Sequence, residues 1–179
     1  MNQSNNPPVP FADSYWVIPG QFLAGENPAK SGDEPTIIRR VQALLKSGIS
    51  VFYDLTEKAN GHGHYAPILY REAAEYGLAA RYLNFPIIDF TAPSVEMVKT
   101  ILDSIDESLA AEKSIYLHCY AGIGRTGTIV GCFLARHGLT GQEALDQLKL
   151  LRADTPSWFT RSPEDDRQID LVRNWKSGT

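Results

Sequence analysis

Short runs of β-branched and aromatic residues recur along the chain and predict the strands of a sheet. Residues 15–18 and 21–24 flank Pro19-Gly20, a pair typical of turns, and this arrangement predicts a hairpin at the sheet edge. Three further β-rich runs predict strands at residues 49–55, 81–85 and 114–118. The sheet is therefore expected to have about four or five strands.

Between these runs, apolar residues recur three or four positions apart, which predicts helices. Gly48 is placed to end the first helix, Ser94 to cap the third, and Thr140 with Glu143 to form a capping box. Ser162, followed by Pro163, predicts the start of the last helix. The helices are expected at about residues 37–45, 67–76, 94–109, 126–136, 140–151 and 162–175.

Strands that alternate with helices predict an α/β fold with a central, mostly parallel sheet flanked by helices. We expect one domain over residues 13–179, preceded by a polar, proline-rich tail at residues 1–12. Parallel strands in such a series point the same way, so the loops that follow them meet at one edge. Segments 56–65 and 86–93 and the loop after His118 should therefore converge there.

Charge and composition narrow the function classes. The 179 residues include 17 basic and 21 acidic side chains, a net charge of −4, which argues against a broad cationic surface for nucleic acid or anionic lipid. No apolar run approaches the roughly 20 residues that cross a bilayer, and the N-terminus lacks a signal-peptide pattern. The two cysteines cannot form a disulfide framework. We expect a soluble, reduced, cytoplasmic protein.

The loop between the third predicted buried strand and its following helix has the composition of an anion site. It runs from His118 to Gly127, and its backbone N–H groups lie at the positive end of a helix dipole. Gly122 and Gly124 allow the N–H groups to turn inward, and Arg125 offers a planar fork that matches two phosphate oxygens. Cys119, at the base of this cradle, is expected to be a reactive thiolate rather than a buried small hydrophobe.

The run from His118 to Gly127 resembles the HCxxGxGRTG signature of the cysteine-dependent tyrosine and dual-specificity protein phosphatases. This resemblance implies a tyrosine-phosphatase-like fold and no metal or other cofactor. It implies that Cys119 is the nucleophile, that Arg125 binds phosphate, that Thr126 stabilises the leaving thiolate, and that His118 tunes the cysteine. The implied phosphate-binding residues are Tyr120, Ala121, Gly122, Ile123, Gly124 and Arg125.

Phosphoryl transfer to a thiolate also needs an acid to protonate the leaving oxygen. The resembled family carries an aspartate on a mobile loop about thirty residues before the cysteine, and Asp89 occupies that position here. Conventional tyrosine phosphatases have Trp-Pro-Asp at this point, whereas this chain has Ile-Ile-Asp. Asp89 is therefore predicted to be the general acid, with a loop that closes over the substrate.

Several weaker candidates remain open. Arg152 and Gln168 resemble an arginine and a glutamine that support the loop or orient water in some family members, although residues 155–159 look like an insertion. Trp158 and Phe159 are expected to pack under the last helix rather than to rim the cleft. His62 and His64 are expected to be solvated loop residues rather than metal ligands. Cys132 is expected to be a buried helix residue rather than a redox partner of Cys119. Asp54 and Glu57 have no assigned role.

The leading hypothesis is an enzyme that hydrolyses phosphate monoesters, phosphotyrosine in proteins above all, through a cysteinyl-phosphate. The alternative is a phosphoinositide or other small-molecule phosphatase, but Tyr120, Ala121 and Ile123 supply no charge for additional phosphates. A phosphate-binding pseudoenzyme is disfavoured because Cys119, Arg125 and Asp89 are all present. A rhodanese-like sulfur transferase would have no use for the aspartate. The sequence does not indicate the oligomeric state or the physiological substrate.

Overall fold

The central layer of the protein is a five-stranded sheet in the order β1-β2-β5-β3-β4. The computed structural model describes residues 7–57 and 64–178. Only β1 runs antiparallel to its neighbour, and the remaining pairs are parallel. The strands are β1 (Ser14–Ile18), β2 (Phe22–Gly25), β3 (Ile49–Asp54), β4 (Arg81–Asn84) and β5 (Ser114–His118). The predicted hairpin and the predicted parallel sheet are both confirmed.

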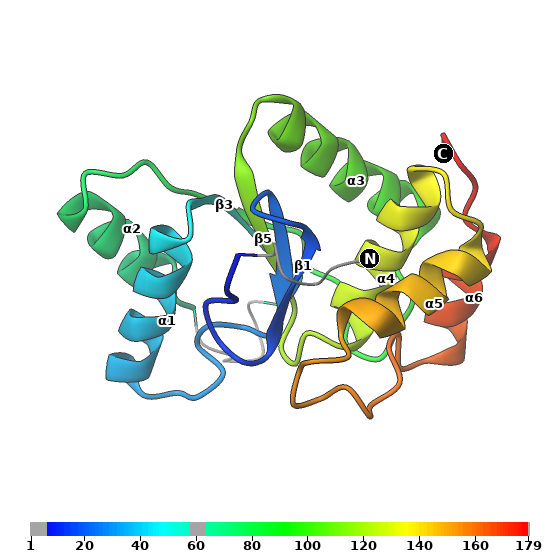
Figure 1. Ribbon diagram of the computed structural model, residues 1–179, viewed down its shortest axis with the longest axis horizontal. Helices are drawn as coiled ribbons and strands as arrows, with labels where there is room; N and C mark the ends of the chain where they lie inside the picture. The colour runs from blue at the N-terminus through cyan, green and yellow to red at the C-terminus, as the bar shows by residue number, and fades with distance from the viewer. Residues whose placement is uncertain (1–6, 58–63, 179) are drawn as a thin grey trace.

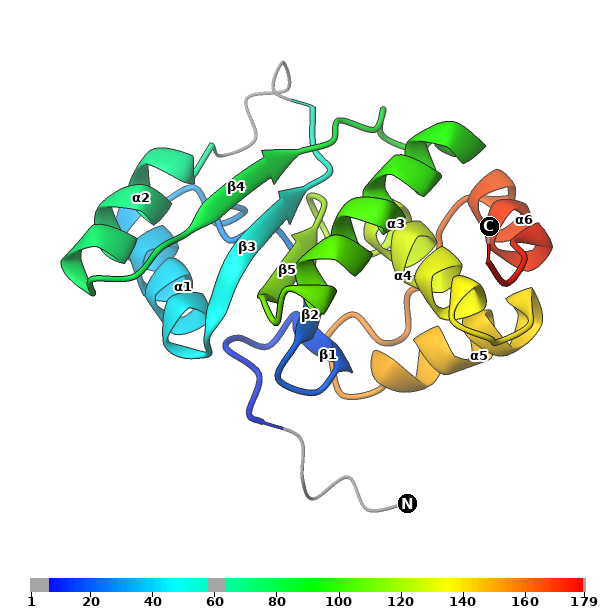
Figure 2. The ribbon, with the colours of Figure 1, turned by 90° about the horizontal axis from the view of Figure 1, so that it is seen from above.

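Helices cover both faces of this sheet, as Figures 1 and 2 show. One face carries α1 (Glu34–Lys46) and α2 (Ala66–Glu75). The opposite face carries α3 (Val95–Ala110), α4 (Gly124–Arg136), α5 (Gly141–Leu151) and α6 (Asp166–Asn174). This arrangement confirms the predicted α/β class, with the sheet as a middle layer between two helical layers.

The side chains of β3 alternate between the two apolar cores on either side of the sheet. Val51 and Tyr53 face the core beneath α3 and α4, whereas Phe52 faces the core beneath α1 and α2. The buried Tyr53 hydroxyl donates to the carbonyl of Ser104 on α3 at 2.6 Å, so this polar group is satisfied inside the core. Because β3 is covered on both faces, its run of apolar residues is nearly continuous.

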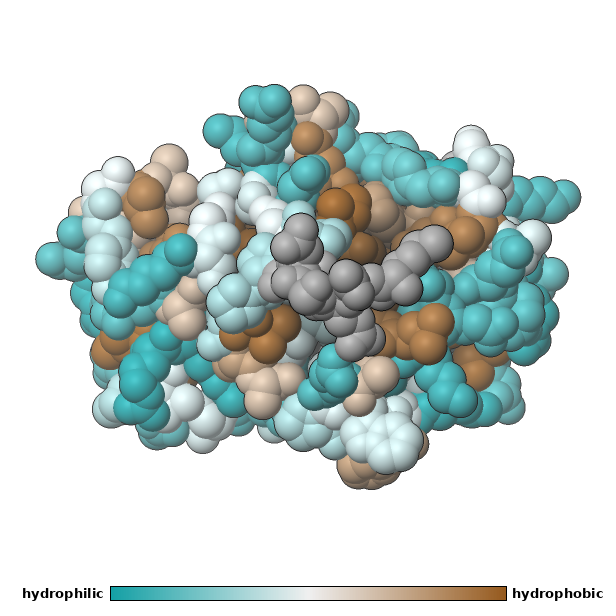
Figure 3. Space-filling view, viewed as in Figure 1, coloured by the Kyte–Doolittle hydropathy of each residue, from teal (hydrophilic) through white to brown (hydrophobic). Residues whose placement is uncertain are grey.

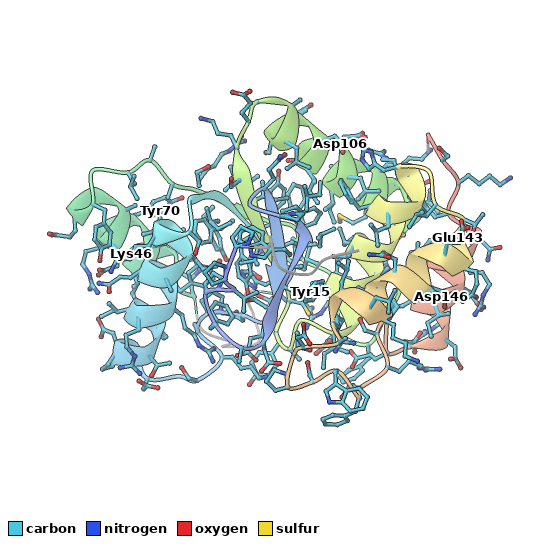
Figure 4. The ribbon with its side chains drawn as sticks, viewed as in Figure 1. Tyr15, Lys46, Tyr70, Asp106, Glu143 and Asp146 are labelled. Carbon is cyan, nitrogen blue, oxygen red and sulfur yellow. The ribbon has the colours of Figure 1, made fainter. Side chains whose placement is uncertain are left out.

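Three predicted helix caps form as expected from the sequence. The Ser94 hydroxyl accepts from the N–H of Met97, and Thr140 and Glu143 (Glu143 is labelled in Figure 4) make a reciprocal capping box at the start of α5. Gly48 follows α1 with φ of 86°, a conformation that glycine adopts readily. Asp106, also labelled in Figure 4, ties α3 to α4 through an ion pair with Arg136 at 2.9 Å.

Two predicted helix starts were wrong. The last helix begins at Asp166 rather than at Ser162, because Asp165 and Gln168 form the capping box while the Ser162 hydroxyl donates to the carbonyl of Ile123 at 2.7 Å. The helix after β5 begins at Gly124, two residues before the predicted start. Ser162 therefore contacts the loop after His118 and does not begin a helix.

The described part of the N-terminal segment packs against β1 and against the core beneath α1 and α2. The carbonyl of Pro7 accepts from the indole N–H of Trp16 at 2.9 Å, and the Phe11 ring meets Tyr116 edge to face. The earlier part of the predicted tail, residues 1–6, lies outside the described residues.

On the face of the molecule shown in Figure 3, hydrophobic side chains form separate patches among hydrophilic ones. None of the helices in the described ranges is long and apolar enough to cross a membrane.

Gly25, at the end of β2, packs against backbone so closely that a side chain has no room. A Cβ at this position would lie 2.4 Å from the carbonyl oxygen of Asp13 and 2.8 Å from the Tyr116 hydroxyl. Gly25→Ala is therefore expected to lower the free energy of unfolding by about 3 kcal/mol. Gly32→Ala is the control, because Gly32 has open space but φ of 77°, and it should cost about 1 kcal/mol. Equal losses in urea unfolding would contradict the steric argument.

Candidate active site

Three loops meet at the edge of the sheet where the parallel strands end, as predicted. Arg125, from the cysteine loop (residues 119–125), contacts Asp89 of the aspartate loop (residues 86–93) at 2.9 Å. On the far side of the aspartate loop, the backbone N–H of Asp89 donates to the Glu57 carboxylate at 3.3 Å. Segments that are far apart in sequence therefore meet at the loop that contains Cys119 and Arg125.

The glycines of the cysteine loop allow it to pack against β2 with almost no space between the backbones. Gly122 has φ of 73°, and a Cβ there would lie 2.5 Å from the carbonyl carbon of Gly25. The N–H of Asn27 donates to the carbonyl of Tyr120 at 3.0 Å, which fixes the loop from outside. Cys119 is buried at the base of this loop, just before the N-terminus of α4. These contacts hold the backbone of the cysteine loop against the end of β2.

Arg125 is buried and connects the two loops. One terminal nitrogen pairs with Asp89, and the other donates to the carbonyl of Ile87 at 3.1 Å. Its Nε–H is buried without a hydrogen-bond partner in the described part of the chain. A buried donor without an acceptor is costly, and an oxyanion supplies the acceptor that a guanidinium edge fits best.

Thr126, the next residue, has a second buried polar atom of this kind. Its hydroxyl is fully buried and makes no hydrogen bond within residues 7–57 and 64–178. Two adjacent residues therefore place unsatisfied donors at the start of α4, beside the cysteine loop. This arrangement suits a bound anion and a sulfur that must accept a hydrogen bond.

His118 is buried directly before the cysteine loop, and its ring is held on both nitrogens. Burial lowers its pKa, against the opposing effect of Asp54, whose carboxylate lies 3.8 Å from Nδ1. The neutral ring must donate from Nδ1 to the carbonyl of Cys119 at 3.0 Å, because a carbonyl can only accept. Its Nε2 then accepts from the Tyr65 hydroxyl at 2.7 Å. Tyr65, a residue that the sequence analysis missed, thus selects the tautomer that holds the Cys119 carbonyl.

The two supporting candidates lie in different places. Gln168 is fully buried, and its amide donates to the carbonyl of Thr91 in the aspartate loop at 2.9 Å. Arg152 is also buried, but it donates to the carbonyls of Ser157 and Thr160. Gln168 therefore contacts the predicted site directly, whereas Arg152 orders the connection between α5 and α6.

The prediction that Trp158 and Phe159 pack under the last helix was wrong. Their exposed fractions are 61% and 75%, and the rings contact each other edge to face. Arg152 donates to the carbonyls of Ser157 and Thr160 in this segment, and the two aromatic side chains lie at the surface. Figure 1 shows the segment in orange at the lower edge of the molecule.

The remaining open candidates are separated from the cysteine loop or satisfied by other contacts. Cys132 is buried on α4, and desolvation raises its thiol pKa, which keeps it protonated. Asp54 accepts from the N–H and the hydroxyl of Thr56, a structural arrangement. His64 is exposed beside the Tyr82 ring, and its predicted companion His62 lies outside the described residues.

Glu164 is a second carboxylate at the site, and the sequence analysis did not identify it. Its Oε1 lies only 2.3 Å from the position that a Cβ on Gly124 would take, which places it against the start of α4. Desolvation raises its pKa, the negative charge of Asp89 raises it further, and Arg125 opposes both effects. Glu164 reaches the site because the segment before α6 packs against the start of α4. No local sequence motif predicts this contact.

Comparison with known proteins agrees with this geometry. The chain is 38% identical over 150 residues to the dual specificity protein phosphatase CDC14B of Mus musculus, an alignment that covers 78% of this chain and 28% of the relative. It is 26% identical over 145 residues to the tyrosine-protein phosphatase CDC14 homolog of Schizosaccharomyces pombe, covering 80% and 27%. The chain thus spans less than a third of the length of these relatives.

A solved structure and a family model both match this chain. The crystal structure of Tk-PTP in its active form superposes with a TM-score of 0.72 and 23% identity, covering 93% of this chain and 97% of that one. A family model described as "Polymorphic toxin system, DSP-PTPase phosphatase" matches residues 29–139, more than half of the chain. The chain therefore belongs to this family of cysteine-dependent phosphatases. The roles of the individual site residues remain predictions.

Glu164 predicts how phosphate binding should depend on pH. When ionised, its carboxylate repels phosphate, so Glu164→Gln should bind inorganic phosphate roughly threefold to tenfold more tightly, after allowance for solvent screening. Because the pKa of Glu164 is raised, both proteins should bind alike at low pH, and the ratio should grow as pH rises above the usual glutamate range. Titration calorimetry with inorganic phosphate at several pH values would measure this ratio of affinities. Asp166→Asn, which removes an exposed carboxylate on α6, is the control, and a ratio independent of pH would contradict the prediction.

Proposed function

We propose that the protein hydrolyses phosphate monoesters, phosphotyrosine in proteins above all, through a cysteinyl-phosphate intermediate. The observation that carries the proposal is the position of Arg125. Its buried Nε–H lacks a partner in the described ranges, while its terminal nitrogens contact the loop that carries Asp89. A nucleophile, an oxyanion donor and a carboxylic acid are the three groups that this reaction needs.

In the first step, the Cys119 sulfur attacks phosphorus while the bond from phosphorus to the leaving oxygen breaks. The N–H groups of the cysteine loop and Arg125 bind the non-bridging oxygens and stabilise their charge in the transition state. Asp89 donates a proton to the leaving oxygen, which departs as an alcohol or phenol.

In the second step, water attacks phosphorus and the bond from phosphorus to Cys119 breaks. Asp89, now ionised, accepts a proton from the water, so it returns to its starting form. The partnerless Thr126 hydroxyl is suited to donate a hydrogen bond to the departing sulfur. Inorganic phosphate and the free thiolate remain, and the cycle consumes one water.

The site favours a substrate with a single phosphate. Tyr120, Ala121 and Ile123 bring no charge to the cysteine loop, and Lys30, above the Tyr120 ring, is paired with Glu26 at 2.6 Å. A phosphoinositide needs cations for its additional phosphates, which disfavours the alternative function. A panel of phosphotyrosine, phosphoserine and phosphothreonine peptides, inositol lipids and nucleotides would test this choice. Faster turnover of the lipids than of any peptide would overturn it. A phosphorylated cytoplasmic protein is the proposed partner.

The nucleophile is tested by Cys119→Ser. A serine hydroxyl stays protonated where a thiolate forms, so hydrolysis of every substrate should fall to background. Phosphate affinity should stay within about threefold, since the Arg125 fork and the loop amides remain. Calorimetry with inorganic phosphate would measure the retained binding. Undiminished hydrolysis by the variant would overturn the covalent mechanism.

The acid is tested by Asp89→Asn on two esters that differ in leaving group. A phosphotyrosine peptide should react roughly 10²–10⁴-fold more slowly, and an aryl phosphate with a nitro-activated phenol much less so, because its oxygen leaves without protonation. The alkaline limb of the rate profile should also flatten in the variant. Rates on both esters across pH decide the assignment. An equal loss on both, with the alkaline limb intact, would exclude Asp89.

A further inference from the structure

The aspartate loop is in an unfavourable backbone conformation beside the residue that it presents. Phe90, next to Asp89, has φ of 55°, a left-handed value that is uncommon for a large side chain. Phe90 is 64% exposed, so core packing contributes little to holding it in this conformation. Other contacts must therefore hold this loop in place.

Helix α6 supplies such contacts through two adjacent residues. Nη2 of Arg167 donates to the carbonyl of Phe90 at 2.9 Å, and the amide of Gln168 donates to the carbonyl of Thr91 at 2.9 Å. Gln168 is fully buried, and its Oε1 accepts from the N–H of Asp165 in the capping box. The start of α6 is thereby joined to the two residues that follow the predicted acid.

The link between Arg125 and Asp89 cannot hold the loop during catalysis. A phosphate dianion in the cysteine loop competes for the same guanidinium nitrogen that Asp89 contacts. Once the substrate takes that nitrogen, Asp89 loses its ion pair at the moment when it must face the leaving oxygen. The bonds from α6 go to backbone carbonyls and do not involve Arg125, so substrate binding leaves them intact.

We propose that Arg167 and Gln168 are positioning residues that hold the aspartate loop over the bound phosphate, so that Asp89 can protonate the leaving oxygen. The proposal rests on the function proposed above. In this proposal, α6 affects the proton transfer from Asp89. It does not affect phosphate binding by the cysteine loop or the attack by Cys119.

Matched variants separate this role from a general loss of structure. Arg167→Ala removes one donor, and Arg167→Lys restores a single donor. Gln168→Glu keeps the acceptor of the capping box but places an oxygen against the Thr91 carbonyl. Arg173→Ala is the control, since it removes an exposed arginine of the same helix whose partner is Asp170. Thermal unfolding and inorganic phosphate binding are measured on every variant.

The expected signature is a loss that depends on the leaving group. Turnover of a phosphotyrosine peptide should fall about threefold to tenfold in Arg167→Ala and at least tenfold in Gln168→Glu, with partial recovery in Arg167→Lys. An activated aryl phosphate should lose less than half of its rate, and the alkaline limb should weaken. Phosphate affinity should match the wild type in Arg167→Lys, which keeps the charge. Arg173→Ala should match the wild type on both esters.

Two results would overturn the proposal while leaving the proposed function intact. One is an equal loss of rate on both esters in the Arg167 and Gln168 variants. The other is wild-type turnover of the phosphotyrosine peptide by both of them. By contrast, a wild-type protein that hydrolyses neither ester would refute the proposed function itself, and the positioning role with it.

Discussion

The site depends on the contact of one buried guanidinium with two loops. Arg125 carries a positive charge in the interior, and a charge there needs close partners to offset its lost hydration. It finds them in the Asp89 carboxylate and the Ile87 carbonyl, both on the aspartate loop. The position of Arg125 therefore depends on the aspartate loop, whereas the aspartate loop is also held by bonds from α6. This contact makes one site out of segments that are far apart in sequence, since Ile87 and Arg125 lie 38 residues apart.

Close backbone packing fixes the other side of the same loop. Gly122 and Gly25 touch through their backbones, and Gly127 lies against the Ser162 side chain at a distance that excludes a Cβ. The glycines of the signature thus serve two purposes. Gly122 provides a left-handed φ, whereas Gly124 and Gly127 allow the segment before α6 to approach α4. This approach brings Glu164, Arg167 and Gln168 to the site.

Local sequence could predict the part of the site that local structure determines. Cys119 and Arg125 lie at fixed positions between a strand and a helix, and Asp89 lies on a loop that parallel topology directs to the same edge. Glu164 and Arg167 reach the site only through tertiary packing, and their own segments carry no signal for it. Tyr65 ends a segment that was predicted to reach this edge, but its hydrogen bond to His118 has no local signal. The start of the last helix was misplaced for the same reason, since Ser162 has a partner in the cysteine loop. The layered α/β arrangement, the hairpin and most helix ends could be predicted from the spacing of apolar residues and from the capping residues.

The ion pair of Asp89 with Arg125 relates substrate binding to the position of the aspartate loop. The guanidinium contacts the Asp89 carboxylate at 2.9 Å and the Ile87 carbonyl at 3.1 Å, so it holds this loop against the cysteine loop. Under the proposed function, a phosphate dianion bound by the cysteine loop competes for the same guanidinium. The bonds from α6 to the carbonyls of Phe90 and Thr91 do not involve Arg125. They therefore persist when phosphate takes the ion pair, which is the condition that the proposed acid step places on this loop.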